Sequence, residues 1–268
     1  MTPADVVTDW APDPGAILLV VVAGTLYGLG VRRLDRRGRS WPPGRSAAFG
    51  GAVTAVVVAT CSGLATHEAE SFTAHAGQHA LLALVAPLLL ALAAPLTLAL
   101  QAADRPVQQG LARLVHSAPV AALTQPVVVW AAWGATLVAL YTTSLYDASL
   151  RTGWLHAAIH LHMLGVGLLF CWTAVGLDPG RHRLPYGARL LFVLLAVPFH
   201  AVVGLSLLGD PERAAGVGLL WAAGELFGLV ATAVVVAQWM EAEERAAARA
   251  DRAPVPERPV PSEISAQA

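Results

Sequence analysis

Long apolar segments recur along this chain, separated by short polar or charged stretches. An α-helix rises about 1.5 Å per residue, so about 20 apolar residues cross the ~30 Å hydrocarbon layer of a membrane. Hydrophobic residues make up 56% of the 268 and charged residues only 13%, whereas soluble domains carry about 25% charge. We therefore predict an all-α, polytopic membrane helix bundle. Its seven transmembrane helices are expected at residues 16–31, 47–66, 77–100, 119–142, 154–176, 188–208 and 217–240.

Two pairs of tryptophans support two of these spans. Trp154 and Trp172 bracket the fifth, and Trp221 and Trp239 bracket the seventh. Indole rings favour the membrane interface, and the spacing within each pair corresponds to ~27 Å of helix, close to the hydrocarbon thickness. Both helices are expected to be near-complete crossings.

The arginines predict the orientation of the bundle. The chain has no lysine, so all 17 of its basic residues are arginines. All but Arg151 and Arg213 fall on one side of the predicted bundle. By the positive-inside rule this side is cytoplasmic, which places the N-terminus outside and the C-terminus in the cytoplasm.

The apolar spans share one bundle, so we predict a single membrane domain at residues 16–240. Residues 1–15 form an extracytoplasmic segment, which lacks the basic start of a secretory signal, so the first span is expected to be retained. Residues 241–268 form a cytoplasmic tail that is helical and then, from Pro254, disordered. The net charge of −1 gives no indication of a nucleic-acid partner.

Prolines and glycines predict how some helices bend and pack. Pro87 and Pro95 lie in the third span and Pro198 in the sixth, and proline typically kinks a helix by removing a hydrogen bond. Gly165 and Gly167 in the fifth span favour close contact with a neighbouring helix.

Histidines gather at one end of the predicted bundle. Seven of the nine fall at or just below its outer face, where ionisable side chains usually mark ion paths, proton relays or metal sites. They are His67, His75, His79, His156, His160, His162 and His200.

Two histidine pairs have helical spacing. His75 and His79 are four residues apart and so share a helix face, as do His156 and His160 on the fifth span. Met163 continues the face of the second pair. The two spans together could present several imidazoles and one thioether to a common ion.

Two further histidines are candidate ligands. His162 lies about 200° around the helix from His160, so both cannot face one small site, and His160 is preferred because it shares the face of Met163. His200 could complete the ligand set from the sixth span.

Glu225 is the acidic residue that falls inside a predicted span. It lies ~6 Å below the outer interface, a depth close to that of the histidines. Two roles remain open: a proton-linked carboxylate that supports the metal ligands, or a buried packing residue with a polar partner.

Several neutral imidazoles with one thioether suit copper, and zinc would also accept the nitrogens. The alternatives are separate hydrogen-bonded core histidines, a b-type haem with histidine ligands for electron transfer, and a proton-coupled transporter that uses Glu225 and the histidines. No P-loop, G-x-S-x-G or H-E-x-x-H motif is present, so the sequence gives no indication of an enzyme.

A series of short motifs, over roughly residues 47–240, resembles the bacterial multi-spanning cytochrome c oxidase assembly factor family, CtaG. Several motifs in a fixed order are more specific than any one of them. They are His75-Ala-Gly-Gln-His79, Val85-Ala-Pro87, Ala94-Pro95, His156-Ala-Ala-Ile-His160-Leu-His162, Val175-Gly-Leu-Asp178-Pro179, Arg183-Leu-Pro185-Tyr186, Pro198-Phe-His200 and Trp221-Ala-Ala-Gly-Glu225.

The resemblance implies a seven-span protein of the bacterial plasma membrane that assembles haem–copper oxidases, with copper handling as its usual proposed role. The expected partners are haem–copper oxidase subunits, the lipid bilayer and other copper chaperones. Members often place methionines beside the histidines of the third span, where this chain has Ala76 and Ala80, which leaves Met163 as the nearby thioether. The family's functional residues map here to His75, His79, His156, His160, His162, His200 and Glu225.

Overall fold

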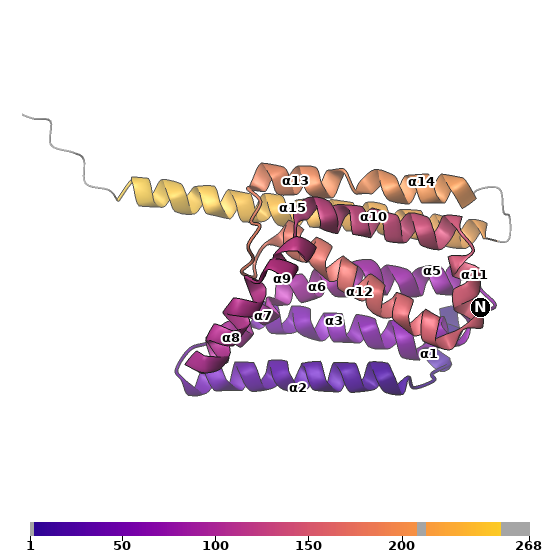
Figure 1. The fold of residues 1–268 in the computed structure, drawn as a ribbon, viewed down its shortest axis with the longest axis horizontal. Coiled ribbons are helices and arrows are strands. Elements are labelled where there is room, and N and C mark those ends of the chain that lie inside the picture. The colour runs from indigo at the N-terminus through magenta and orange to yellow at the C-terminus, as the bar shows by residue number, and fades with distance from the viewer. Residues whose placement is uncertain (1–2, 208–212, 253–268) are drawn as a thin grey trace, which may run out of the picture.

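The computed structural model describes residues 3–207 and 213–252, and within them every regular element is a helix. Most helices run side by side in an elongated bundle (Figure 1). Six stretches are long and apolar enough to span a membrane, and a seventh counts if α10 (Pro126–Thr142) and α11 (Leu145–Arg151), bent by 74°, form one span. The protein is therefore a multi-pass membrane protein. The six are α2 (Pro14–Arg36), α3–α4 (Pro43–Cys61 and Gly63–Thr66), α5–α7 (Phe72–Ala102), α12 (Gly153–Val175), α13–α14 (Tyr186–Leu194 and Val197–Leu207) and α15 (Ala214–Ala250).

The two ends of the bundle differ in chemistry. One end, which we call the arginine end, holds the turn between α2 and α3, and the short helices α8 (Arg105–Val115) and α9 (Ala118–Leu123) (Figure 1). The opposite end, which we call the histidine end, holds the starts of α5 and α12 and the helix α1 (Pro3–Thr8). The predicted assignment of these ends to the cytoplasm and the outside stays a prediction.

Helix boundaries in the first and fourth spans differ from the sequence prediction. The fourth span does not run from 119 to 142, because α10 begins only at Pro126, where the Gln125 side chain accepts a hydrogen bond from the backbone N–H of Val128. Proline lacks an N–H and so suits a helix start. The first span is longer than predicted, and α2 is capped by Asp13 and ends at Arg36.

The regular α-helix of the third span is interrupted near both of its prolines, where kinks were predicted. Its segments are α5 (Phe72–Ala80), a π-helical turn η1 (Leu81–Val85), α6 (Ala86–Ala93) and α7 (Pro95–Ala102). A π turn directly precedes Pro87, where the missing N–H interrupts the regular hydrogen-bond pattern. Ala94, just before Pro95, adopts the left-handed conformation with φ 48°.

Polar side chains satisfy the backbone groups that the break at Ala94 frees. The hydroxyl of Tyr27 donates to the carbonyl of Ala93 at 3.2 Å, and Asp178 accepts from the N–H of Thr97 at 2.7 Å. A break inside the hydrocarbon layer needs such partners, because water is absent there.

Close packing at Gly167 joins the third and fifth spans. A Cβ atom at Gly167 would collide with the carbonyl of Ala83 and the ring of Pro87, so only glycine allows this approach. The predicted helix contact is thus confirmed at Gly167, whereas Gly165 has open space around its Cα. This contact holds α12 against η1 and α6. The histidine pairs lie nearer the start of the same two spans.

α15 continues as helix to Ala250, ten residues beyond the predicted end of the seventh span at 240, and extends past the bundle at the arginine end (Figure 1). The disorder predicted from Pro254 onward lies outside the described residues.

Candidate metal centre

Four histidine rings meet between α5 and α12. Within the helices, the ring centroids of His75 and His79 are 3.9 Å apart, and those of His156 and His160 are 4.1 Å apart. Between the helices, His75 lies 6.0 Å from His156, and His79 lies 5.4 Å from His160. We call these four residues the histidine cluster. The spacing of four residues within each pair turns both rings toward the neighbouring helix.

The α5 side of the histidine cluster is buried and short of hydrogen-bond partners. His75 is 0% exposed and His79 1% exposed. Both ring nitrogens of His75 and Nε2 of His79 have no hydrogen-bond partner in the described part of the chain. Buried polar atoms are normally paired, so these unpaired nitrogens are free to act as donors to a ligand.

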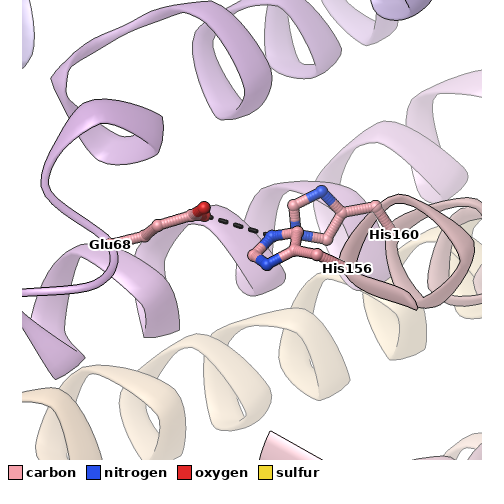
Figure 2. Close-up of side chains that lie close together, drawn as sticks. All are labelled: Glu68, His156 and His160. Carbon is pink, nitrogen blue, oxygen red and sulfur yellow. Dashed lines mark hydrogen bonds and ion pairs between the residues drawn. The ribbon is translucent and has the colours of Figure 1, made fainter. Parts of the chain in front are cut away.

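The α12 side lies nearer the surface and includes a carboxylate. Nε2 of His156 is 2.8 Å from Nε2 of His160 and 3.2 Å from Oε2 of Glu68 (Figure 2). One donor atom from each of these three residues lies within 4.8 Å of the other two. Oε2 of Glu68 is buried and accepts no hydrogen bond among the described residues.

Glu68 is not among the ligands predicted from the sequence. It lies in the turn between α4 and α5, which carries no helical periodicity and reads as a polar loop. The turn is fixed by His67, whose Nε2 lies 2.8 Å from Oδ2 of Asp9, and by α1, which packs so closely on α4 that Gly63 has no room for a Cβ. The one available signal was an acidic residue shortly before the first histidine pair.

Aromatic side chains flank the buried side of the histidine cluster. The ring of Tyr146 stands edge-on to His75 at 4.6 Å, and Phe72 lies 5.6 Å from Tyr146. The guanidinium of Arg213 lies over both aromatic rings. These contacts cover His75 from the histidine end of the bundle.

His200 does not join the histidine cluster. It is 2% exposed, both its ring nitrogens lack a partner among the described residues, and its ring packs against Trp133 of α10 at 5.2 Å. On its other side it fills the space that Gly224 of α15 leaves by lacking a Cβ. The structure therefore places the ring from the sixth span against Trp133 and Gly224, and its role as a ligand stays a prediction.

His162 faces away from the histidine cluster. Its Nε2 is 2.9 Å from the hydroxyl of Thr136, on an exposed face between α10 and α12, whereas His160, preferred over His162, lies beside His156 as expected. Met163 is 2% exposed and lines a small core cavity with Ala83 and Trp133, one helical turn beyond His160 on α12. Its role as a ligand stays a prediction.

Glu225 points away from the histidines. It lies on the exposed face of α15, where its carboxylate accepts a hydrogen bond from the indole N–H of Trp221 at 3.1 Å. Its depth suggested a place beside the ligands, but depth does not determine the direction in which a helical side chain projects.

The rings of the histidine cluster lie close together, with centroid separations from 3.9 to 6.0 Å. The rings of a tetrahedral four-imidazole site with metal–nitrogen bonds of ~2.0 Å have centroids about 5 Å apart, which lies within this range. Among the described residues, the donor atoms that lie within 4.8 Å of one another are those of Glu68, His156 and His160.

Comparisons with known proteins identify relatives. The chain is 32% identical over 273 residues to an uncharacterized protein of Mycobacterium leprae, covering 91% of this chain and 41% of that protein. It is also 32% identical over 281 residues to uncharacterized proteins of Mycobacterium bovis and Mycobacterium tuberculosis, covering 94% of this chain and 42% of each. The chain thus spans less than half the length of these relatives. No solved structure matches it.

The cytochrome c oxidase caa3 assembly factor family, CtaG, matches residues 25–242, which include every span from α3 to α14 and most of α15. The match covers the helices that carry the histidine cluster and agrees with the motif resemblance. The chain belongs to the cytochrome c oxidase caa3 assembly factor family.

Proposed function

We propose that this protein supports the assembly of a haem–copper oxidase by holding copper transiently at the histidine cluster. The observation that carries the proposal is the convergence of His75, His79, His156 and His160 from two helices, with unpaired nitrogens on the buried side. The chain belongs to an oxidase assembly family, so the protein that would receive the copper is the oxidase. The role needs no bond-making reaction.

The donor set supports copper as the cargo. Imidazole suits copper and zinc, and copper binds such sites more tightly than the other divalent first-row metals. Glu68 adds a carboxylate oxygen, which both metals accept. Met163, the thioether expected to assist copper(I), lies one helical turn beyond His160 and lines a small core cavity.

The graded burial of the donors supports transfer. His156 and Glu68 have side chains that are 14% and 21% exposed, whereas His75 and His79 are fully enclosed. An ion could thus meet Glu68 and His156 first and the buried pair afterwards. Under the predicted orientation, this exposed margin faces the extracytoplasmic space.

The geometry favours copper over the two alternatives. A haem between two axial histidines separates their rings by a macrocycle, whereas these rings are in direct contact. A proton relay through Glu225 would need that carboxylate near the histidines, and it is instead bonded to Trp221 on an exposed face.

The test is copper binding by the full chain purified in detergent. Copper affinity of the wild type is compared with that of a His79→Ala, His160→Ala double variant. The control is a His116→Ala, His182→Ala variant, which removes two imidazoles from the arginine end. We expect the first variant to lose at least ~100-fold in affinity, since removing even an outer-shell partner costs 10–100-fold, and the control to match the wild type.

Circular dichroism and size-exclusion chromatography verify that each variant is folded. Equal copper affinity in the wild type and the cluster variant would contradict the proposal, as would a Soret band in the purified protein. Tighter binding of zinc than of copper would contradict the choice of cargo. In cells, the cluster variant is expected to lower the copper content of the assembled oxidase.

A further inference from the structure

A second site lies at the opposite end of the bundle, where a cavity opens between the end of α12, the loop 176–185 and the helices α8 and α9. Its polar wall carries Arg181, His182, Arg183 and the guanidinium of Arg189. Its apolar wall includes Val120 of α9. The first three of these polar side chains are exposed, so the cavity is accessible from the surface.

Arg189 carries a buried charge that the protein does not neutralise. It is 7% exposed, and its guanidinium donates to the carbonyls of Leu184 and Val175 at 2.9 and 3.1 Å and contacts the amide oxygen of Gln238 at 3.4 Å. All three acceptors are neutral. No ion pair involves this arginine among the described residues. A buried charge without a counter-ion is costly, so its retention in a cavity wall indicates an anion.

The other arginines around the cavity also lack an anionic partner among the described residues. Arg183 donates to the carbonyl of Gly176 at 2.9 Å, and neither it nor Arg181 forms an ion pair within the described residues. Asp178 also lines the cavity, but its carboxylate is occupied by the backbone N–H and hydroxyl of Thr97. The wall of the cavity therefore holds three arginines and one carboxylate, and that carboxylate is already hydrogen-bonded to Thr97.

The loop that carries these arginines is held in place. The ring nitrogen Nε2 of His182 lies 3.1 Å from the carbonyl of Ala121 in α9, and the indole N–H of Trp172 donates to the carbonyl of Asp178 at 3.4 Å. Gly176 adopts φ 59° and lies directly against the guanidinium of Arg189, where a Cβ would collide with it. The loop and the guanidinium of Arg189 are thus held in place before any ligand binds.

We propose that this cavity binds a phosphate group, which is the anion that arginine clusters recognise best. The group can belong to a lipid headgroup or to a free phosphate ion. The surroundings favour a lipid, because Val115, Val120 and Leu169 continue the cavity into an apolar wall. Leu114 and Leu123 on the adjoining α8 and α9 are 60% exposed, as expected for helices that lie at a membrane surface.

The experiment measures lipid retention by the full chain in detergent, using native mass spectrometry. Phosphatidylglycerol, which is anionic, is compared with phosphatidylcholine, whose phosphate is balanced by its own cation. The test variants are Arg181→Gln and the Arg181→Gln, Arg183→Gln pair. The matched control is Arg245→Gln, Arg249→Gln, which removes the same charge from the exposed end of α15 at the same end of the molecule.

We expect the wild type to retain phosphatidylglycerol in preference to phosphatidylcholine, and the double variant to lose about 30-fold in affinity, from the contribution of each arginine near an anionic membrane surface. Arg181→Gln alone removes a side chain with no hydrogen bond or ion pair among the described residues, so it tests the site without a change in the fold. A smaller loss in this single variant, with normal thermal stability, supports the proposal.

A parallel arm adds inorganic phosphate to the loaded protein. Retention of the lipid in excess phosphate supports a lipid ligand, and displacement by phosphate supports the same chemistry from a soluble source. Equal losses in the test and control variants, or no preference for phosphatidylglycerol in the wild type, would overturn the proposal.

Discussion

The phenol oxygen of Tyr141 lies 3.0 Å from Nδ1 of His79, and both side chains are buried. The unpaired Nε2 of His79 can bind a metal only when Nδ1 carries the ring proton. In this tautomer the hydroxyl of Tyr141 accepts a hydrogen bond from Nδ1, which leaves Nε2 free for an ion. Under the proposed function, Tyr141 would therefore position His79 without contacting the metal.

Tyr141→Phe is expected to weaken copper binding by about 10- to 100-fold, the usual cost of losing an outer-shell partner. The matched control is Tyr146→Phe, which keeps the ring edge that contacts His75. Competition titration with a copper chelator measures both affinities. If the two variants bind copper equally well, the hydrogen bond to Tyr141 does not position His79.

Glu68 is expected to contribute charge at the exposed margin of the histidine cluster. Glu68→Gln keeps the shape of the side chain but removes the anion that lies 3.2 Å from His156. We expect slower copper uptake and an affinity reduced by at least ~10-fold, measured by stopped-flow and equilibrium titration. The control is Glu70→Gln, since Glu70 is in the same turn with a side chain that is 84% exposed. Matching effects in the two variants would show that only the general charge of the turn matters.

The sequence predicted the spans and the two histidine pairs because both depend on local periodicity. Apolar length places a helix in the membrane, and a spacing of four residues puts His156 and His160 on one face. His160 was preferred over His162 on the same ground, and the structure places it beside His156.

Tertiary packing determines which neighbour a helix face contacts. The predictions of which residues surround the histidine cluster were therefore incomplete. His200 packs against Trp133 of α10, a contact between helices far apart in the sequence. Glu68 was missed because its place depends on a turn held from the N-terminal segment by Asp9. Neither contact has a periodic signal along the chain. Glu225 instead bonds to Trp221 four residues earlier on α15, and this helical spacing does not show which neighbouring helix the face meets.

Gly167 is expected to be essential for the approach of α12 to the third span. Gly167→Val would drive a branched side chain into the carbonyl of Ala83 and the ring of Pro87. Overpacking of this kind costs about 1–3 kcal/mol, so we expect a lower midpoint of thermal unfolding in detergent and weaker copper binding. Gly165→Val is the control, because nothing lies within 4 Å of the added Cβ. Equal midpoints for the two variants would contradict the proposed close contact.

The contact between Asp9 and His67 is expected to depend on pH in a defined direction. Hydrogen bonds from His67 and, to a smaller extent, Thr8 hold the pKa of the Asp9 carboxyl below its ordinary value. A lowered carboxyl pKa stabilises the folded state above the unfolded pKa of about 3.9, and this stability is lost as the pH falls through the lower folded pKa. The N-terminal segment should therefore stay attached to the turn at Glu68 until the solution is strongly acidic.

Two variants should move the pKa of Asp9 in opposite directions. His67→Gln removes the main hydrogen bond and is expected to raise it toward the ordinary value, whereas Asp5→Asn removes a nearby negative charge and is expected to lower it further. Carboxyl ¹³C chemical shifts of labelled aspartate, followed through an acid titration, measure both changes. A pKa of Asp9 that stays the same in His67→Gln would mean that the ion pair does not hold the turn, and Glu68 would then need another element to keep it beside His156.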